Sequence, residues 1–256
     1  MTMTEDDRLY ADPALADFYD LDNDWADDQE TCARMAADAG SVLDLGCGTG
    51  LFCATLTQRL PDIACVGVDP ATAMLDIARS RPGGDRAVWI EDDARTVRLG
   101  KTFDLIVLTG HAFQVFLTEL DQLAALQTIA VHLSPGGRFI FDSRNPLKEE
   151  WKGWRKDGGD SAWNIDHPLH GRVEAWTDAE QDPETGVVTY ETHYRIAESG
   201  KHLFAESKIR FSDHSTIDRL IREAGLAVDT WLGNWKGDAF TPASKEIIPI
   251  GGLARV

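Results

Sequence analysis

The chain has 256 residues, of which 43% are hydrophobic, enough for one large domain or for one domain that carries a substantial insertion. Its formal net charge of −18 at pH 7 argues against a nucleic-acid partner, because the phosphate backbone would be repelled. An acidic field favours neutral or cationic small molecules instead. No apolar run approaches the roughly 18 residues that a membrane helix needs, so we expect no membrane partner.

The cysteines and the amino terminus together predict a cytoplasmic location. The first residues are acidic and lack the apolar stretch of a signal peptide. The four cysteines show no paired spacing typical of a metal site, and a chain of this length does not suggest a disulfide framework. We therefore expect reduced thiols and no bound metal.

The first 40 residues are predicted to form an N-terminal helical cap. Twelve of the acidic residues fall in this segment, with aromatic residues between them. Helical segments are expected over residues 13–19 and 25–39. Aromatic side chains in such segments usually pack on a core.

A strand followed by a glycine-rich turn comes next, in the sequence VLDLGCGTG of residues 42–50. Its apolar residues suit a central parallel strand that is covered on both faces. Its glycines permit backbone angles forbidden to other residues and allow a ligand to approach the main chain. Residues 51–60 predict a helix that stops at Pro61. A loop that leads into a helix in this way presents free N–H groups to the polar end of a ligand.

Two ligand classes fit this unit of strand, loop and helix. One is a dinucleotide, whose pyrophosphate binds the spacing G-x-G-x-x-G. The other is S-adenosylmethionine, whose amino-acid end carries an ammonium group. The third glycine here comes one position too early for the dinucleotide pattern. Asp44 would also repel a pyrophosphate but attract an ammonium group.

Strands and helices alternate through the rest of the chain, with one interruption. Strands are expected over residues 41–45, 63–68, 87–90, 103–108, 138–141, 227–232 and 247–250. Residues 145–211 instead contain three alternating segments joined by turns, which predict an inserted antiparallel sheet. The fold class is therefore α/β: a seven-stranded, mostly parallel, doubly wound sheet with a small antiparallel insertion and a helical cap. The predicted domains are 1–40, then 41–144 with 212–256, and the insertion 145–211.

The segment Asp44-Leu45-Gly46-Cys47-Gly48-Thr49-Gly50 resembles motif I of the class I, Rossmann-like S-adenosylmethionine-dependent methyltransferases, D-x-G-x-G-x-G. The turn Ser134-Pro135-Gly136-Gly137 is similar to the L-x-P-G-G motif of the same family. The resemblance implies that S-adenosylmethionine is the cofactor and S-adenosylhomocysteine the product. It implies that the cofactor contacts Asp44, Gly46, Cys47, Gly48 and Gly50.

The second strand ends in a further candidate cofactor site. Asp69 follows Gly50 by about the 20 residues expected before an acidic residue that binds ribose. Its carboxylate can accept from both ribose hydroxyls, Met74 on the following helix would pack against the adenine, and Pro70 is a further candidate cofactor contact. The alternative is that Asp69 only caps the helix that begins near Ala71.

The third strand leads into an acidic turn that would hold the adenine. Asp93 followed by Ala94 resembles the family motif that binds the adenine amino group, and Asp92 is the second choice. The alternative is a turn whose acids face water.

The loop after the fourth strand, with Thr109, Gly110 and His111, should pass beneath the transferring methyl, because ligands of open α/β sheets bind beyond the carboxyl ends of the strands. His111 is the candidate catalytic proton acceptor. The alternative is that it only lines the pocket or binds backbone. Asp142, Ser143, Arg144 and Asn145, at the end of the fifth strand, are also candidates to face substrate, and the alternative for Arg144 is an ion pair with the N-terminal acids.

The resemblance covers about residues 40–145 well and residues 212–256 loosely, and a narrower resemblance, of architecture and not of motif residues, involves the N-terminus and the insertion. Tyr19 and the insertion look like those of bacterial small-molecule N-methyltransferases, such as amino-sugar N,N-dimethyltransferases, in which an N-terminal tyrosine segment closes over the cofactor. We expect methyl transfer to a nitrogen or oxygen of a small molecule. The alternatives are a dinucleotide-dependent oxidoreductase and a non-catalytic S-adenosylmethionine-binding protein. The insertion either covers the active site or forms a homodimer interface.

Overall fold

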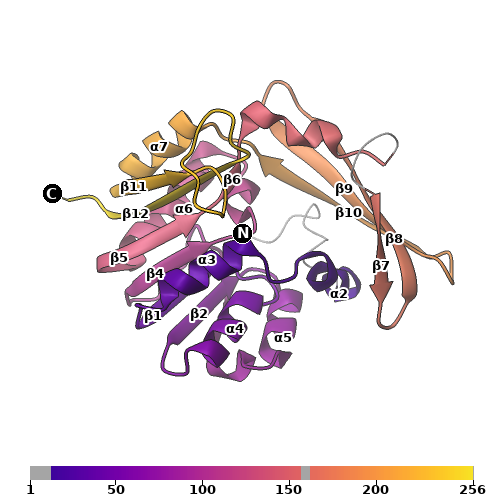
Figure 1. Ribbon diagram of the computed structural model, residues 1–256, viewed down its shortest axis with the longest axis horizontal. Coiled ribbons are helices and arrows are strands. Elements are labelled where there is room, and N and C mark those ends of the chain that lie inside the picture. The colour runs from indigo at the N-terminus through magenta and orange to yellow at the C-terminus, as the bar shows by residue number, and fades with distance from the viewer. Residues whose placement is uncertain (1–12, 157–161, 256) are drawn as a thin grey trace. The chain divides into compact units, whose positions relative to one another are not determined.

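The computed structural model describes residues 13–156 and 162–255, and the chain divides into two compact units. The larger unit comprises residues 25–148 and 211–256, and the smaller comprises residues up to 24 with residues 149–210. Figure 1 shows the elements of both units. The first twelve residues of the predicted cap lie outside the described part. The predicted domain boundaries stay a prediction.

The larger unit is built on one sheet with the strand order β11-β12-β5-β4-β1-β2-β3. The five strands from β5 to β3 are parallel, whereas β12 is antiparallel to both of its neighbours. This confirms the predicted fold class, a mostly parallel sheet of seven strands, and the short β6 pairs in addition with β12. The strands are β1 Ser41–Leu45, β2 Ala64–Asp69, β3 Val88–Glu91, β4 Phe103–Leu108, β5 Leu133–Phe141, β6 Ser143–Arg144, β11 Leu226–Leu232 and β12 Glu246–Leu253.

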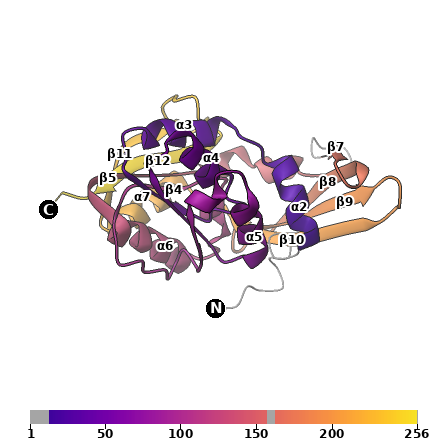
Figure 2. The ribbon, with the colours of Figure 1, turned by 90° about the horizontal axis from the view of Figure 1, so that it is seen from below.

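Helices cover both faces of this sheet because successive residues of a buried strand point to opposite sides. Leu43 joins a core with residues of α6 and α7, whereas its neighbour Val42 joins a second core with residues of α3 and α4. Figure 2 shows the helices on either side. They are α3 Asp27–Ala36, α4 Leu51–Arg59, α5 Thr72–Ser80, α6 Glu119–His132 and α7 His214–Glu223, with short 3-10 turns η2 Gly84–Arg86, η3 Ala112–Val115 and η4 Pro146–Lys148.

The smaller unit contains a four-stranded antiparallel sheet in the order β10-β9-β8-β7. One face packs against α2, where Phe18 stacks on Tyr194 of β9 with ring centroids 4.5 Å apart. The sequence predicted three of these strands and missed β7, whose six residues include Ala, Asn and Asp, which are depleted in strands. The elements are α2 Pro13–Asp22, η5 Glu150–Gly153, β7 Ala162–His167, β8 Gly171–Gln181, β9 Val187–Ile196 and β10 His202–Arg210.

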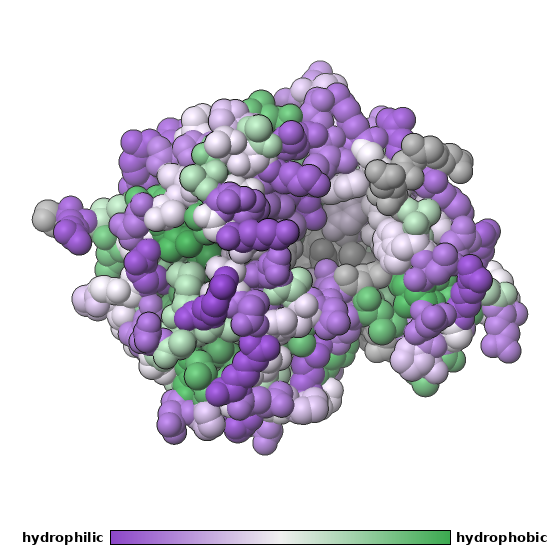
Figure 3. Space-filling view, viewed as in Figure 1, coloured by the Kyte–Doolittle hydropathy of each residue, from purple (hydrophilic) through white to green (hydrophobic). Residues whose placement is uncertain are grey.

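On the face drawn in Figure 3, hydrophilic side chains predominate, with smaller hydrophobic patches between them. Within the described residues, no helix combines the length and the apolar character that crossing a membrane demands.

Candidate active site

The glycine-rich loop joins the end of β1 to the start of α4, and backbone bonds tie it to β2. The N–H groups of Gly46 and Cys47 donate to the carbonyl of Val68 at 2.8 and 3.1 Å. Gly50, the N-cap of α4, has a φ of 72°. A Cβ added at Gly50 would lie 2.5 Å from the ring of Trp89 on β3. The third glycine is therefore needed both for its backbone angle and for the packing of an indole.

The loop after β4 lies directly against this glycine loop. A Cβ added at Gly46 would lie 3.2 Å from the Cβ of Ala112. Since Ala112 follows His111, the structure brings the predicted cofactor loop and the predicted catalytic loop together. Thr109 and Gly110, the two other residues predicted there, precede His111 in the same turn.

Asp44 is buried within β1, where its negative charge is unfavourable. Burial, together with the charge of Asp69, raises the pKa of its carboxyl to about 7. The thiol of Cys53, at 3.9 Å, is its weak hydrogen-bond donor and opposes this shift. A carboxylate held in this way suits a cationic ligand, because an ammonium group would supply the missing countercharge.

Asp69 ties the glycine loop to the start of α5. Its Oδ2 accepts the N–H of Gly48 at 2.8 Å, and its Oδ1 accepts the N–H of Ala71 at 2.9 Å. Burial raises the pKa of Asp69, and the two hydrogen bonds oppose that shift. Each carboxylate oxygen keeps a second lone pair. The side chain therefore holds the loop and can still accept from ribose hydroxyls. The predicted adenine residue Met74 is fully buried on α5, and Pro70 is exposed.

The acidic turn after β3 is partly occupied by an ion pair. Both carboxylate oxygens of Asp93 accept from the guanidinium of Arg95, which also binds Asp121 at 2.9 Å. Burial acts to raise the pKa of Asp93, but the Arg95 bonds outweigh it and the pKa is lowered. Asp92 is exposed, and Ala94 is buried. The contacts of all three with adenine stay a prediction, and the ion pair makes Asp92 the more open carboxylate.

His111 is part of a cluster that the sequence revealed only in part. Its φ is 60°, a left-handed value that is uncommon for a residue other than glycine. Its backbone N–H donates to Oδ1 of Asp142 at 3.0 Å, and its Nε2 lies 3.1 Å from Oε2 of Glu246. Glu246, at the start of β12, was missed because the sequence separates it from His111 by 135 residues.

The cluster is strongly acidic. Burial raises the pKa of Asp142 to about 6, and the charges of Glu246 and Asp28 add to the shift, while His111 opposes it. In Glu246, burial acts to raise the pKa, but the bond from His111 outweighs it and the pKa is lowered. Among the described residues, His111, Asp142 and Glu246 form the one group of potential metal ligands, with ligand atoms within 4.8 Å of one another.

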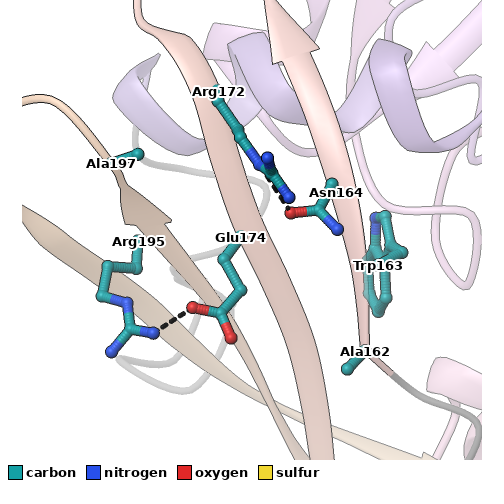
Figure 4. A pocket seen from close by; sticks show the side chains of 7 residues that line it. All are labelled: Ala162, Trp163, Asn164, Arg172, Glu174, Arg195 and Ala197. Atoms are coloured by element: carbon teal, nitrogen blue, oxygen red, sulfur yellow. Dashed lines mark hydrogen bonds and ion pairs between the residues drawn. The ribbon is translucent and has the colours of Figure 1, made fainter.

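Two further features belong to the smaller unit. Tyr19 lies on α2 and is half-buried, and its predicted contact with the cofactor stays a prediction. A pocket on the four-stranded sheet is lined by charged side chains that are already paired (Figure 4). In it, Nε of Arg172 donates to Oδ1 of Asn164 at 3.2 Å, and Arg195 pairs with Glu174. We therefore do not place the chemistry there.

Comparison with known proteins agrees with the geometry of the larger unit. Residues 42–137 match the model of a methyltransferase domain family. The chain is 27% identical over 213 residues to the cypemycin N-terminal methyltransferase of a Streptomyces species, covering 83% of each protein. The chain is a class I S-adenosylmethionine-dependent methyltransferase. Its cofactor is therefore S-adenosylmethionine, as the loop spacing and Asp44 indicate.

Other relatives of this methyltransferase match over most of its length. It is 26% identical to dTDP-3-amino-3,4,6-trideoxy-alpha-D-glucopyranose N,N-dimethyltransferase of Streptomyces venezuelae, covering 87% of this chain and 94% of that protein. The solved structure of the CcbJ methyltransferase from Streptomyces caelestis has a TM-score of 0.77 at 21% identity, covering 99% and 100% of the two chains. The amino pentose methyltransferase CalS10 from Micromonospora echinaspora, solved with its cofactor, has a TM-score of 0.68 at 21% identity, covering 91% and 92%. These structures show the same fold.

Proposed function

We propose that this methyltransferase transfers a methyl group from S-adenosylmethionine to the nitrogen of a small-molecule amine. The observation that carries the choice of nitrogen is the acidic cluster at His111, which adjoins the glycine loop and favours a basic acceptor over a neutral hydroxyl. The extent of the relatives' similarity supports it. The two relatives named as an N-terminal methyltransferase and as an N,N-dimethyltransferase match 83% and 87% of the chain. A malonyl-[acyl-carrier protein] O-methyltransferase matches only 46% of it.

The cofactor would be held by the glycine loop and by two buried carboxylates. Asp44 would bind the ammonium group of the amino-acid end, and Asp69 would accept from the ribose hydroxyls while it keeps its bond to Gly48. Bound S-adenosylmethionine supplies an activated methyl group, so the task of the protein is to orient the acceptor and exclude water. The loop from Thr109 to His111 would form the floor of the acceptor site.

Methyl transfer from labelled S-adenosylmethionine to matched acceptors tests the proposal. The amines are dTDP-3-amino-3,4,6-trideoxyglucose and a short peptide with a free amino terminus, and each is paired with the analogue that carries a hydroxyl in place of the amine. We expect label in an amine and little in its hydroxyl partner. Label in hydroxyls alone would replace the nitrogen acceptor with an oxygen acceptor. Binding of S-adenosylmethionine without transfer to any acceptor would favour a binding protein.

We also propose that the protein acts in the cytoplasm and forms a homodimer. All four cysteines are buried and free, as a reducing compartment allows. On the sheet face opposite α2, a row of aromatic rings crosses three strands, and its outer member Phe204 is 49% exposed. Light scattering measures the molar mass of the wild type and of Phe204→Glu. We expect a dimer for the wild type and a monomer for the variant. A monomeric wild type would exclude the homodimer.

A further inference from the structure

The tautomer of His111 is set by the carboxylates around it. Its Nε2 lies 3.1 and 3.2 Å from the two carboxylate oxygens of Glu246, and 3.4 Å from Oδ2 of Asp142. A ring nitrogen that faces two carboxylates carries the hydrogen. Nε2 is therefore the donor, and in the neutral imidazole the lone pair is on Nδ1.

The side chains of the cluster differ in whether a ligand can reach them. The side chains of His111 and Glu246 are 23% and 17% exposed, whereas that of Asp142 is 1% exposed. Asp142 also accepts the backbone N–H of His111, which stabilises the left-handed conformation at that residue. A ligand can therefore touch His111 and Glu246, and Asp142 acts behind them.

The charges that face the cluster leave it acidic. Asp28 of α3 adds a third carboxylate, which interacts with both His111 and Asp142. The cations that face Glu246 are Arg144 and Lys245, and Arg144 also donates to Oε1 of Gln114 at 3.0 Å. Of these charges, the carboxylates of Glu246 and Asp142 lie 3.1 and 3.4 Å from Nε2 of His111. Such an environment attracts a positively charged group.

We propose that His111 and Glu246 bind the protonated amine of the methyl acceptor and that His111 removes its proton, with Asp142 as a positioning residue. This inference rests on the proposed function. It also explains why the cluster borders the cofactor loop, since Ala112, next to His111, packs against Gly46. The class of ligand is a small primary or secondary alkylammonium group.

The proton and electron balance of the step is complete within the site. An N–H bond of the ammonium breaks, its electron pair stays on nitrogen, and the proton goes to Nδ1 of His111. Nε2–H of the resulting imidazolium stays donated to Glu246. The nitrogen lone pair then forms a bond to the methyl carbon as the carbon–sulfur bond breaks and its electron pair stays on sulfur. The products are a methylated ammonium and S-adenosylhomocysteine, and His111 returns its proton to water.

The first test measures binding without catalysis. Full-length protein with ¹⁵N-labelled histidine, saturated with S-adenosylhomocysteine, is titrated with methylammonium chloride while the His111 resonances are followed by NMR. We expect a saturable shift, and the isosteric variant Glu246→Gln should bind at least tenfold more weakly. The matched control is Glu191→Gln, which removes the carboxylate 3.0 Å from Nε2 of His193 in the smaller unit. It should bind as the wild type does.

Two outcomes of this titration would overturn the inference. One is an equal affinity for methylammonium in the wild type and in Glu246→Gln. The other is displacement of methylammonium by micromolar Mn²⁺ in the wild type but not in Glu246→Gln, which would make the cluster a metal site.

The second test uses turnover of the amine that accepts label in the transfer assay. In His111→Gln, kcat/KM should fall at least tenfold at pH 7 and recover at high pH, where the amine is neutral without help. Asp142→Asn should change the pH profile in the same direction but less. A pH-independent loss in His111→Gln would show a purely structural role. If no amine accepts methyl, the proposed function fails, and the methylammonium titration still decides this inference.

Discussion

The carboxylate of Asp69 accepts the backbone N–H of Gly48 at 2.8 Å, so the end of β2 holds the glycine loop in place. The same carboxylate binds the first turn of α5 through Ala71. The side chain expected to bind ribose thus also shapes the loop that would bind the amino-acid end of the cofactor.

Replacement of Asp69 by Asn should weaken cofactor binding. The charged acceptor is lost for the ribose and for Gly48, and hydrogen bonds to charged groups contribute about 1.5–3 kcal/mol, so we expect a Kd about 10- to 100-fold higher. Calorimetric titration with S-adenosylhomocysteine measures it. Asp104→Asn is the control, since Asp104 accepts from Gly40 and Ser41 where β1 begins. Equal Kd values in the wild type and Asp69→Asn would show that the ribose lies elsewhere.

The stability of the cofactor-free protein should depend on pH through Asp44. Its folded-state pKa of about 7 lies above the ordinary value of 3.8. The folded state therefore holds the proton more tightly, and this stabilisation is full below pH 3.8 and is lost as the pH rises to 7. Asp44→Asn should flatten the fall in Tm over that window by an amount that thermal scans resolve. Parallel pH curves for the two proteins would contradict this account.

Cofactor affinity should show the opposite trend with pH. An ammonium group binds the ionised form of Asp44, so protonation of Asp44 below pH 7 should weaken binding. We expect the Kd of S-adenosylhomocysteine to rise as the pH falls from 8 to 6 in the wild type. In Asp44→Asn it should be high and nearly constant. A constant wild-type Kd would place the ammonium away from Asp44.

Gly50→Ala should destabilise the fold through Trp89. The new Cβ would lie 2.5 Å from the indole, and the φ of 72° is unfavourable for alanine. We expect a loss of about 1–3 kcal/mol in the free energy of unfolding, measured with urea. The second change Trp89→Leu should recover part of the loss because it removes the clash, whereas alone it should destabilise. Strict additivity of the two changes would show that the indole contact contributes nothing, and that the backbone angle and the clash with the Cβ of Ala78, 2.6 Å from the new Cβ, account for the loss.

The two acids after β3 should respond differently to removal of their charge. Asp93→Asn breaks the ion pair with Arg95 and should lower the midpoint of thermal unfolding. Asp92→Asn should leave that midpoint nearly unchanged and weaken binding of S-adenosylhomocysteine. Thermal scans and calorimetry on both variants separate these effects. Weaker binding in Asp93→Asn alone would return the adenine contact to Asp93.

Local sequence signals predicted the parallel sheet well. Runs such as residues 103–108 are buried except for Asp104, and their alternation with helices leaves few possible sheet topologies. The sequence did not predict features that depend on contacts between residues far apart in the chain. Strand β7 is stabilised by its ladder with β8 rather than by its own residues. Glu246 reads as an ordinary charged residue at a strand start, and only the antiparallel placement of β12 brings it to His111.

The contact between Trp89 and the glycine loop has a practical consequence. The indole packs beside Gly50 and Gly67, and its Nε1 donates to the carbonyl of Gly84 at 2.8 Å, so the ring is held rigidly beside the loop. Its fluorescence should therefore respond to a ligand bound at the loop, and the difference from a Trp89→Phe variant would isolate that signal from the other tryptophans. The protein carries its own optical reporter, and ligand screening needs no added dye.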